Sequence, residues 1–78
     1  MSGKYPVGTK LEEQLENGFT YHAPTEDQVV RITAIRDLMK SVAFFMCKQC
    51  PQSRELSLAL TNLEQANFWA NAAIVRNE

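Results

Sequence analysis

Two long stretches of the chain repeat apolar residues at alternating spacings of three and four positions, which is the pattern of an amphipathic helix. In residues 26–49 the stripe consists of Ile32, Ile35, Met39, Val42 and Met46. In residues 54–76 it consists of Leu56, Leu60, Leu63, Asn67, Ala70 and Ile74. Each stretch is therefore predicted to form a helix with one face packed against a neighbour.

Start and stop signals bound both predicted helices. Thr25 is a good N-cap, and Gln28 stands three positions later, as in a capping box. Pro51 disfavours helical geometry at the residue before it, and Ser53 then offers a second N-cap. Because this connection is short, the two helices should run antiparallel as a hairpin, and the predicted fold is all-α.

The first 24 residues carry a weaker pattern. The segment KLEEQLENG, residues 10–18, can form a short helix that ends at Gly18, and FTYHAP, residues 19–24, is expected to be extended. Only Leu11 and Leu15 give the short helix an apolar face. We therefore divide the chain into a lead, residues 1–20, and a hairpin domain, residues 21–78.

A chain of 78 residues buries only a small core, and such chains usually gain stability from disulfides, a metal or self-association. Both predicted helices carry apolar residues beside their main stripes, namely Val30, Ala34, Leu38, Phe45, Leu58, Trp69, Ala72, Ala73 and Val75. A seam between two helices covers only one face of each. The extra rows therefore predict another covering surface, most simply further copies of the chain in a compact homo-oligomer.

Charge and hydropathy argue against two kinds of partner. The net charge is −1 and the pI is near 5.8. The chain therefore does not have the positive electrostatic field that holds long nucleic acids. A small anion held by two or three arginines is still compatible with this balance. The longest apolar run, residues 42–47, is far shorter than the ~20 residues of a membrane span, so no membrane partner is expected.

Cys47 and Cys50 form the motif CKQC, which can serve as a redox pair or as half of a zinc site. The chain has one histidine, His22, and no third cysteine, so tetrahedral zinc would need ligands from several chains. With no signal peptide and only two cysteines, we expect reduced thiols in a cytosolic protein without metal or cofactor.

The chain lacks the sequence signatures of common enzymes. It has no glycine-rich phosphate loop, no HExxH and no GxSxG motif. His22 has no paired nucleophile and is expected to be a surface residue. We therefore expect a protein that is not an enzyme.

Aromatic and basic side chains are the best candidates for binding, because aromatic faces stack on bases and arginine forks hold phosphates. These candidates are Phe19, Tyr21, His22, Arg31, Arg36, Arg54 and Arg76. Asn67 and Asn71, which flank Trp69, have two open roles. They can fix the register of packed helices, as a buried polar residue does in coiled coils, or they can contact a ligand.

Residues 53–78 read SRELSLALTNLEQANFWANAAIVRNE, and residues 21–39 read YHAPTEDQVVRITAIRDLM. The first segment resembles the second helix of the hairpin domain of phage-encoded cyclic-nucleotide sponges, the anti-CBASS and anti-Thoeris proteins. The second is similar to the first helix of that domain and its aromatic lead. The resemblance implies a helical oligomer, a hexamer in the anti-CBASS branch. Such a protein sequesters a cyclic oligonucleotide messenger in the host bacterial cytoplasm without cleaving it.

The resemblance also implies binding residues. In the anti-CBASS branch a tyrosine ahead of the first helix stacks on a base, and a basic residue fifteen positions later contacts the phosphates. These roles fall here on Tyr21 and Arg36, with arginine in place of the lysine of relatives. Thr25 and Arg31 are further candidates near the same end. The candidates for a second site, which takes a larger ring in some relatives, are Asn67, Asn71 and Arg76.

The spacing of the two main candidates bears on assembly. Thr25 and Arg36 are separated by about 16 Å of helix, and Tyr21 lies farther out. We therefore expect Tyr21 of one protomer to face Arg36 of another. The lead is longer than in the compact anti-CBASS form and closer to that of the anti-Thoeris relatives, whose messenger is a cyclic ADP-ribose derivative. A sponge for that messenger, and a hairpin adaptor for a protein partner, are the alternatives.

Overall fold

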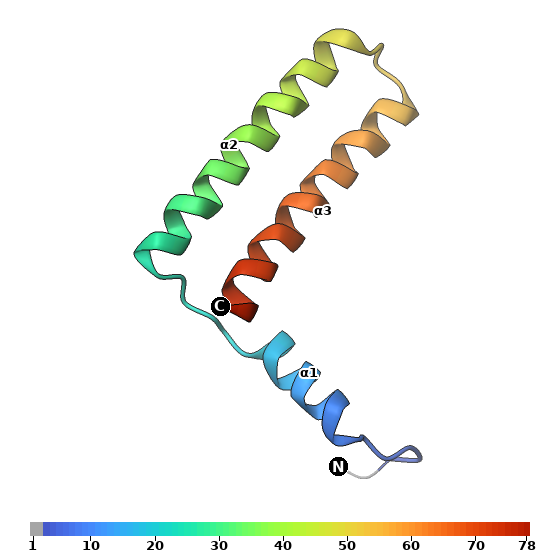
Figure 1. Ribbon diagram of the computed structural model, residues 1–78. Helices are drawn as coiled ribbons and strands as arrows, with labels where there is room; N and C mark the ends of the chain where they lie inside the picture. Colours follow the sequence, from blue (N-terminus) through green and yellow to red (C-terminus); the bar gives the residue numbers. More distant parts are fainter. Residues whose placement is uncertain (1–2) are drawn as a thin grey trace.

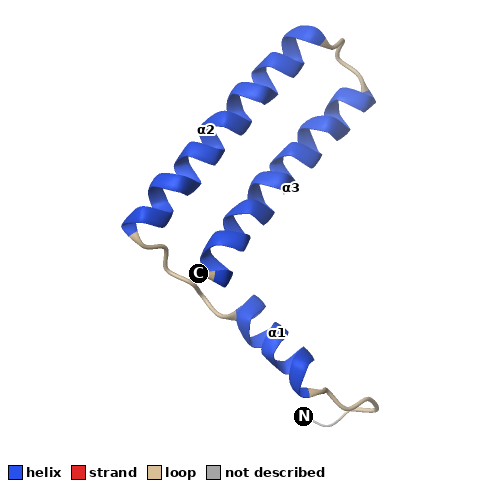
Figure 2. Cartoon of the chain, in the orientation of Figure 1, coloured by secondary structure: helices blue, strands red, loops and turns tan. Residues whose placement is uncertain are grey.

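The computed structural model describes residues 3–78, which form three helices. The helices are α1 (Thr9–Phe19), α2 (Glu26–Gln49) and α3 (Arg54–Asn77). Within residues 3–78 there is no strand, which confirms the all-α class (Figure 2). α2 and α3 lie side by side and antiparallel, and α1 projects from the open end of this hairpin (Figure 1). No helix among these residues has the length and apolarity to cross a membrane.

α2 begins and ends where its local signals predict. The Oγ1 of Thr25 accepts from the backbone N–H of Gln28 at 3.2 Å, and the Oε1 of Gln28 accepts from the N–H of Thr25 at 3.0 Å. This reciprocal pair is a complete capping box. At the other end, Cys50 takes extended geometry before Pro51 and ends the helix.

α3 begins with a simpler cap. The Oγ of Ser53 accepts from the N–H of Leu56 at 3.2 Å, and its hydroxyl donates to the carbonyl of Pro51 at 3.1 Å. Glu55 in the first turn and Arg76 in the last turn suit the helix dipole. The helix extends to Asn77, one residue beyond the predicted range.

The seam between α2 and α3 follows the two predicted stripes with one exception. Ile32 and Leu56 are each 8% exposed and are the most buried large side chains of the seam. Val42, which we expected in the stripe, is 40% exposed, and Ala43 takes its place as a half-buried residue. Both residues continue a pattern of three and four from Met39, so spacing alone does not distinguish them.

The extra apolar rows are uncovered in the single chain. Leu38 and Val30 are about two-thirds exposed, as is Phe45, and Trp69 is more than half exposed. Ala72 and Val75 are the exceptions: Ala72 is buried and lines the cleft between α1 and α3, and Val75 is half-buried. The chain extends over 52 × 35 × 16 Å along its three principal axes. The hairpin consists of two helices packed side by side, so it is a single layer with two open faces (Figure 1).

α1 contributes little to the core, and none of its residues is buried. Its apolar residues Leu11 and Leu15 are 47% and 44% exposed. The helix includes Phe19, which we expected in the extended segment that follows. The expectation for His22 is also wrong, because its ring is half-buried and its Nε2–H donates to the carbonyl of Asn17 at 2.8 Å. This bond ties the link between α1 and α2 back to α1.

Candidate ligand-binding site

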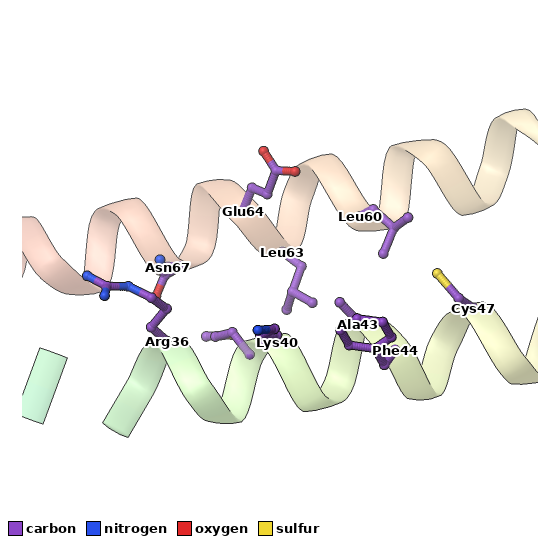
Figure 3. A pocket seen from close by; sticks show the side chains of 10 residues that line it. Arg36, Lys40, Ala43, Phe44, Cys47, Leu60, Leu63, Glu64 and Asn67 are labelled. Carbon is purple, nitrogen blue, oxygen red and sulfur yellow. The ribbon is translucent and has the colours of Figure 1, made fainter. Parts of the chain in front are cut away.

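A groove with a volume of about 420 Å³ runs along the seam between α2 and α3 (Figure 3). Its lining residues are Arg36, Met39, Lys40, Ala43, Phe44, Cys47, Leu60, Leu63, Glu64 and Asn67. Figure 3 shows Arg36 and Asn67 at one end of the groove and Cys47 at the other. Leu60 and Leu63 point toward α2 between them (Figure 3). The volume is within the range of small-molecule sites.

The groove combines an apolar floor with cations on its α2 side. Arg36 and Lys40 lie one turn apart, and Glu64 is the single carboxylate among the lining residues. Neither cation forms a salt bridge with any residue of the described part of the chain. Both are therefore available to an anionic ligand whose apolar or aromatic part rests on the floor. Lys40 was not among the predicted site residues, although its spacing of four from Arg36 was a readable signal.

Two buried amide oxygens on α3 lack hydrogen-bond partners. The Oδ1 atoms of Asn67 and Asn71 are inaccessible to solvent and accept no hydrogen bond from the residues that the structure describes. A buried acceptor without a donor costs about 1–3 kcal/mol. Because both oxygens are already covered by their own chain, a donor from outside could reach them only after the side chains turn. The two roles considered for this pair, register in an assembly and contact with a ligand, therefore both stay open.

Tyr21 and Thr25 lie away from the groove, at the open end of the hairpin. Tyr21 is 85% exposed on the link between α1 and α2, and its ring is not part of the groove lining. Thr25 uses its hydroxyl oxygen as the N-cap of α2. α2 is continuous between this cap and Arg36. The chain therefore presents the predicted stacking and phosphate residues at two separate places.

Arg31 is engaged by two carboxylates of its own chain. Its Nε–H donates to Asp27 at 3.1 Å, and its two Nη groups donate to the two carboxylate oxygens of Glu78, with 2.8 Å from Nη1 to Oε2. Hydrogen bonds from Arg31 and then from Gln28 lower the pKa of Glu78 to about 2, and the Glu78 bond raises the pKa of Arg31. The pairing joins residues 47 positions apart, so no local pattern predicts it.

The predicted second-site residues do not share one cavity. Asn67 lines the groove, whereas Arg76 lies in a separate cleft of about 430 Å³ between α1 and α3. Trp69, Gln14 and Asn17 also line that cleft. Asn71 lines neither of the two cavities. The three predicted residues therefore do not line a common cavity within one chain.

The two cysteines are free and exposed. Cys47 lies at one end of the groove, and Cys50 is the C-cap of α2. Within residues 3–78 no group of three or more histidine, cysteine, aspartate or glutamate residues is arranged to hold a metal ion. The CKQC motif thus has no further ligand near it in the described chain.

A comparison with known protein families shows to which family the chain belongs. Residues 11–75 match the family model described as Acb2/Tad1, hairpin domain. The chain belongs to the Acb2/Tad1 family. The match covers all of α2, most of α1 and α3 as far as Val75, and it confirms the resemblance to anti-CBASS and anti-Thoeris sponges. Neither curated proteins nor solved structures give a significant match.

Membership of the Acb2/Tad1 family has a general functional meaning. At the level of the family, these are phage anti-defence proteins that sequester cyclic nucleotides. They are binding proteins and not enzymes. A groove with unpaired cations and an apolar floor suits binding of this kind.

Proposed function

We propose that this protein binds cyclic oligonucleotide messengers and holds them without cleavage, so that CBASS effectors are not activated. Cyclic dinucleotides such as 3′,3′-cGAMP are the first candidates, and cyclic trinucleotides are the second. The observation that carries the proposal is the pair of free cations, Arg36 and Lys40, beside an apolar groove in a chain of the Acb2/Tad1 family. The site of action is the host bacterial cytoplasm.

The proposed binding unit is a homo-oligomer, a hexamer by analogy with the anti-CBASS branch. The accessible surface of the chain is 6758 Å². A compact monomer of 8.9 kDa would expose about 4,800 Å². The difference between these two surface areas is comparable with the area that stable protein–protein interfaces bury. The uncovered apolar rows support the same conclusion.

In the proposed complex the ligand bridges protomers. Arg36, with Lys40 one turn away, neutralises the phosphates, and Tyr21 of a second protomer stacks on a base. A cyclic dinucleotide has two phosphates and two bases, so a pair of protomers related by a two-fold axis matches it. The separation of Tyr21 from the groove within one chain supports this arrangement. Thr25 is a weaker contact, and the second-site role of Asn67, Asn71 and Arg76 stays a prediction.

A filtration assay tests the function directly. The purified protein is mixed with 3′,3′-cGAMP, the protein is removed by ultrafiltration, and the retained fraction is heated and analysed by chromatography. We expect the nucleotide to disappear from the filtrate and to return intact on heating. A cleaved product would show an enzyme instead. If the nucleotide passes through, the same assay with cyclic ADP-ribose derivatives tests the anti-Thoeris alternative, which the helix in the lead favours.

Matched substitutions test the proposed residues. Tyr21→Ala should weaken binding by tenfold or more, because each stacked base contributes about 1–3 kcal/mol. Tyr5→Ala is its control, since Tyr5 is 80% exposed and far from the hairpin in sequence. Arg36→Ala should weaken binding strongly, whereas Arg54→Ala should not, because Arg54, at the start of α3, is not part of the groove lining. A sponge should lose messenger binding in Tyr21→Ala while staying assembled, whereas an adaptor that binds no ligand should be unaffected by this substitution.

A further inference from the structure

The open end of the hairpin is joined by a set of polar contacts centred on Gln28. This residue is the one buried polar residue of the described chain, at 8% exposure. Besides forming the capping box with Thr25, its Nε2 group donates to the carbonyl of Ile74 at 3.4 Å and to Oε1 of Glu78 at 3.3 Å. One side chain therefore connects the N-cap of α2 with the last turn of α3, which ends beside it (Figure 1).

Arg31, one turn farther along α2, completes this set. Its two Nη groups bind both carboxylate oxygens of Glu78, a bidentate geometry that fixes direction as well as distance. Gln28 and Arg31 therefore hold the same carboxylate from successive turns of one helix. We call Gln28, Arg31 and Glu78 the clasp.

The clasp lies at the base of the link that carries Tyr21. Five residues, 21–25, lead from the tyrosine to the N-cap, and Pro24 restricts the backbone just before the cap. At its other end the link is tethered by the bond from His22 to the carbonyl of Asn17. The Tyr21 ring is 85% exposed, so the direction in which it points depends on these two anchors of its backbone.

A stacking residue held in its bound orientation loses less entropy on binding than a mobile one. The capping box alone requires only Thr25 and Gln28. Glu78 and Arg31 add contacts that fix the Gln28 amide, and hence the cap, against α3. This arrangement gives a physical route from the end of α3 to the orientation of Tyr21.

We propose that the clasp positions Tyr21 for ligand stacking, and that Arg31 acts through Glu78 and does not itself bind the messenger phosphates. The inference rests on the proposed function, because it assigns a role to residues beside the same site. It changes the expected role of Arg31 from a ligand contact to a positioning residue.

Two substitutions distinguish the two roles of Arg31. Glu78→Gln removes the charge that holds Arg31 and keeps the shape of the side chain. If the clasp positions Tyr21, the affinity for 3′,3′-cGAMP falls about tenfold by calorimetry. If Arg31 binds phosphate directly, the same substitution frees its guanidinium, and an unchanged or higher affinity overturns the proposal. Asp27→Asn is the control, because Asp27 pairs with Arg31 within α2 and has no contact with α3 in the clasp.

A double-mutant cycle tests the connection to Tyr21. In a Tyr21→Ala background, Glu78→Gln should cause no further loss of affinity, because there is no ring left to position. A full additive loss in that background overturns the positioning role.

A ligand-free measurement separates this inference from the proposed function. Order parameters of the backbone amides of residues 20–23, measured by ¹⁵N relaxation, should fall in Glu78→Gln and stay unchanged in Asp27→Asn. Unchanged order in both variants overturns the proposal whatever the protein binds. If the order falls but the wild-type protein retains no cyclic nucleotide, the proposed function fails while the mechanical link from Glu78 to the Tyr21 segment stands.

Discussion

At the turn end of the hairpin, α2 passes into α3 through residues 50–53, whereas at the open end the first turn of α2 and the last turn of α3 have no short covalent connection. The turn end is surrounded by exposed apolar side chains such as Phe44 and Phe45. The open end instead contains the clasp. Directional hydrogen bonds are thus found where the chain itself does not hold the helices together.

The largest effects should come from the buried seam that both ends share. Ile32→Ala near the open end and Leu56→Ala near the turn end should each lower the free energy of unfolding by about 2–4 kcal/mol, because each removes a buried aliphatic side chain. Urea denaturation at fixed protein concentration measures this. Val42→Ala is the control, with an expected loss of about 1 kcal/mol or less at its exposed position. Similar losses in all three would mean that an assembly buries Val42 as deeply as the seam.

Intermediate effects should separate the two ends. Gln28→Ala removes half of the capping box and leaves the carbonyl of Ile74 without its side-chain donor, with an expected cost of about 1–3 kcal/mol. Ser53→Ala removes only the cap of α3, at a cost of about 1 kcal/mol. Thermal and urea unfolding of the two variants compare the ends directly. Equal costs would show that the contacts of Gln28 across the hairpin add no stability.

Acid should weaken the open end selectively. Because the pKa of Glu78 is lowered to about 2 in the folded chain from an ordinary value of 4.5, its ionised form stabilises the fold. That contribution is complete above about pH 4.5 and disappears as the pH falls toward 2. Melting temperatures of the wild type and Glu78→Gln, measured between pH 7 and pH 2.5, should converge at the acid end. A constant difference across this range would contradict the role of the Glu78 charge.

The smallest effect is expected at the turn end. Cys47→Ser and Cys50→Ser should change the affinity for the messenger by less than about twofold, because Cys50 is outside the groove lining and Cys47 lies at the end of the groove opposite Arg36 (Figure 3). The filtration assay measures this under reducing conditions. Loss of retention in either variant would instead support a redox or metal role for CKQC.

Local signals were sufficient to predict the helices. Thr25, Gln28 and Ser53 act within three residues of their own position, so the caps of α2 and α3 could be read from the sequence. The predicted apolar stripes contain one error, Val42. Positions three and four residues after Met39 both continue a helical stripe, so the sequence pattern does not choose between Val42 and Ala43. Phe19 is the last residue of α1, and local sequence preferences are least reliable for predicting where a helix ends.

The candidate site was less accessible to sequence reasoning. Arg36 and Asn67 were selected, and the fold places both in one groove, but Lys40 beside them was missed. The partnership of Arg31 with Glu78 depends on how α3 ends relative to α2, which is a property of the tertiary fold. Tyr21 lies outside the groove of its own chain, and its proposed place beside the groove of another protomer has no signature in one chain.

The single-layer hairpin exposes the apolar side chains Leu38, Phe45 and Trp69 to solvent. Any association that covers these side chains removes apolar surface from water and stabilises the folded chain by mass action. The apparent stability of the protein should therefore rise with its own concentration if the proposed homo-oligomer forms. Melting temperatures measured over a hundredfold range of protein concentration test this directly.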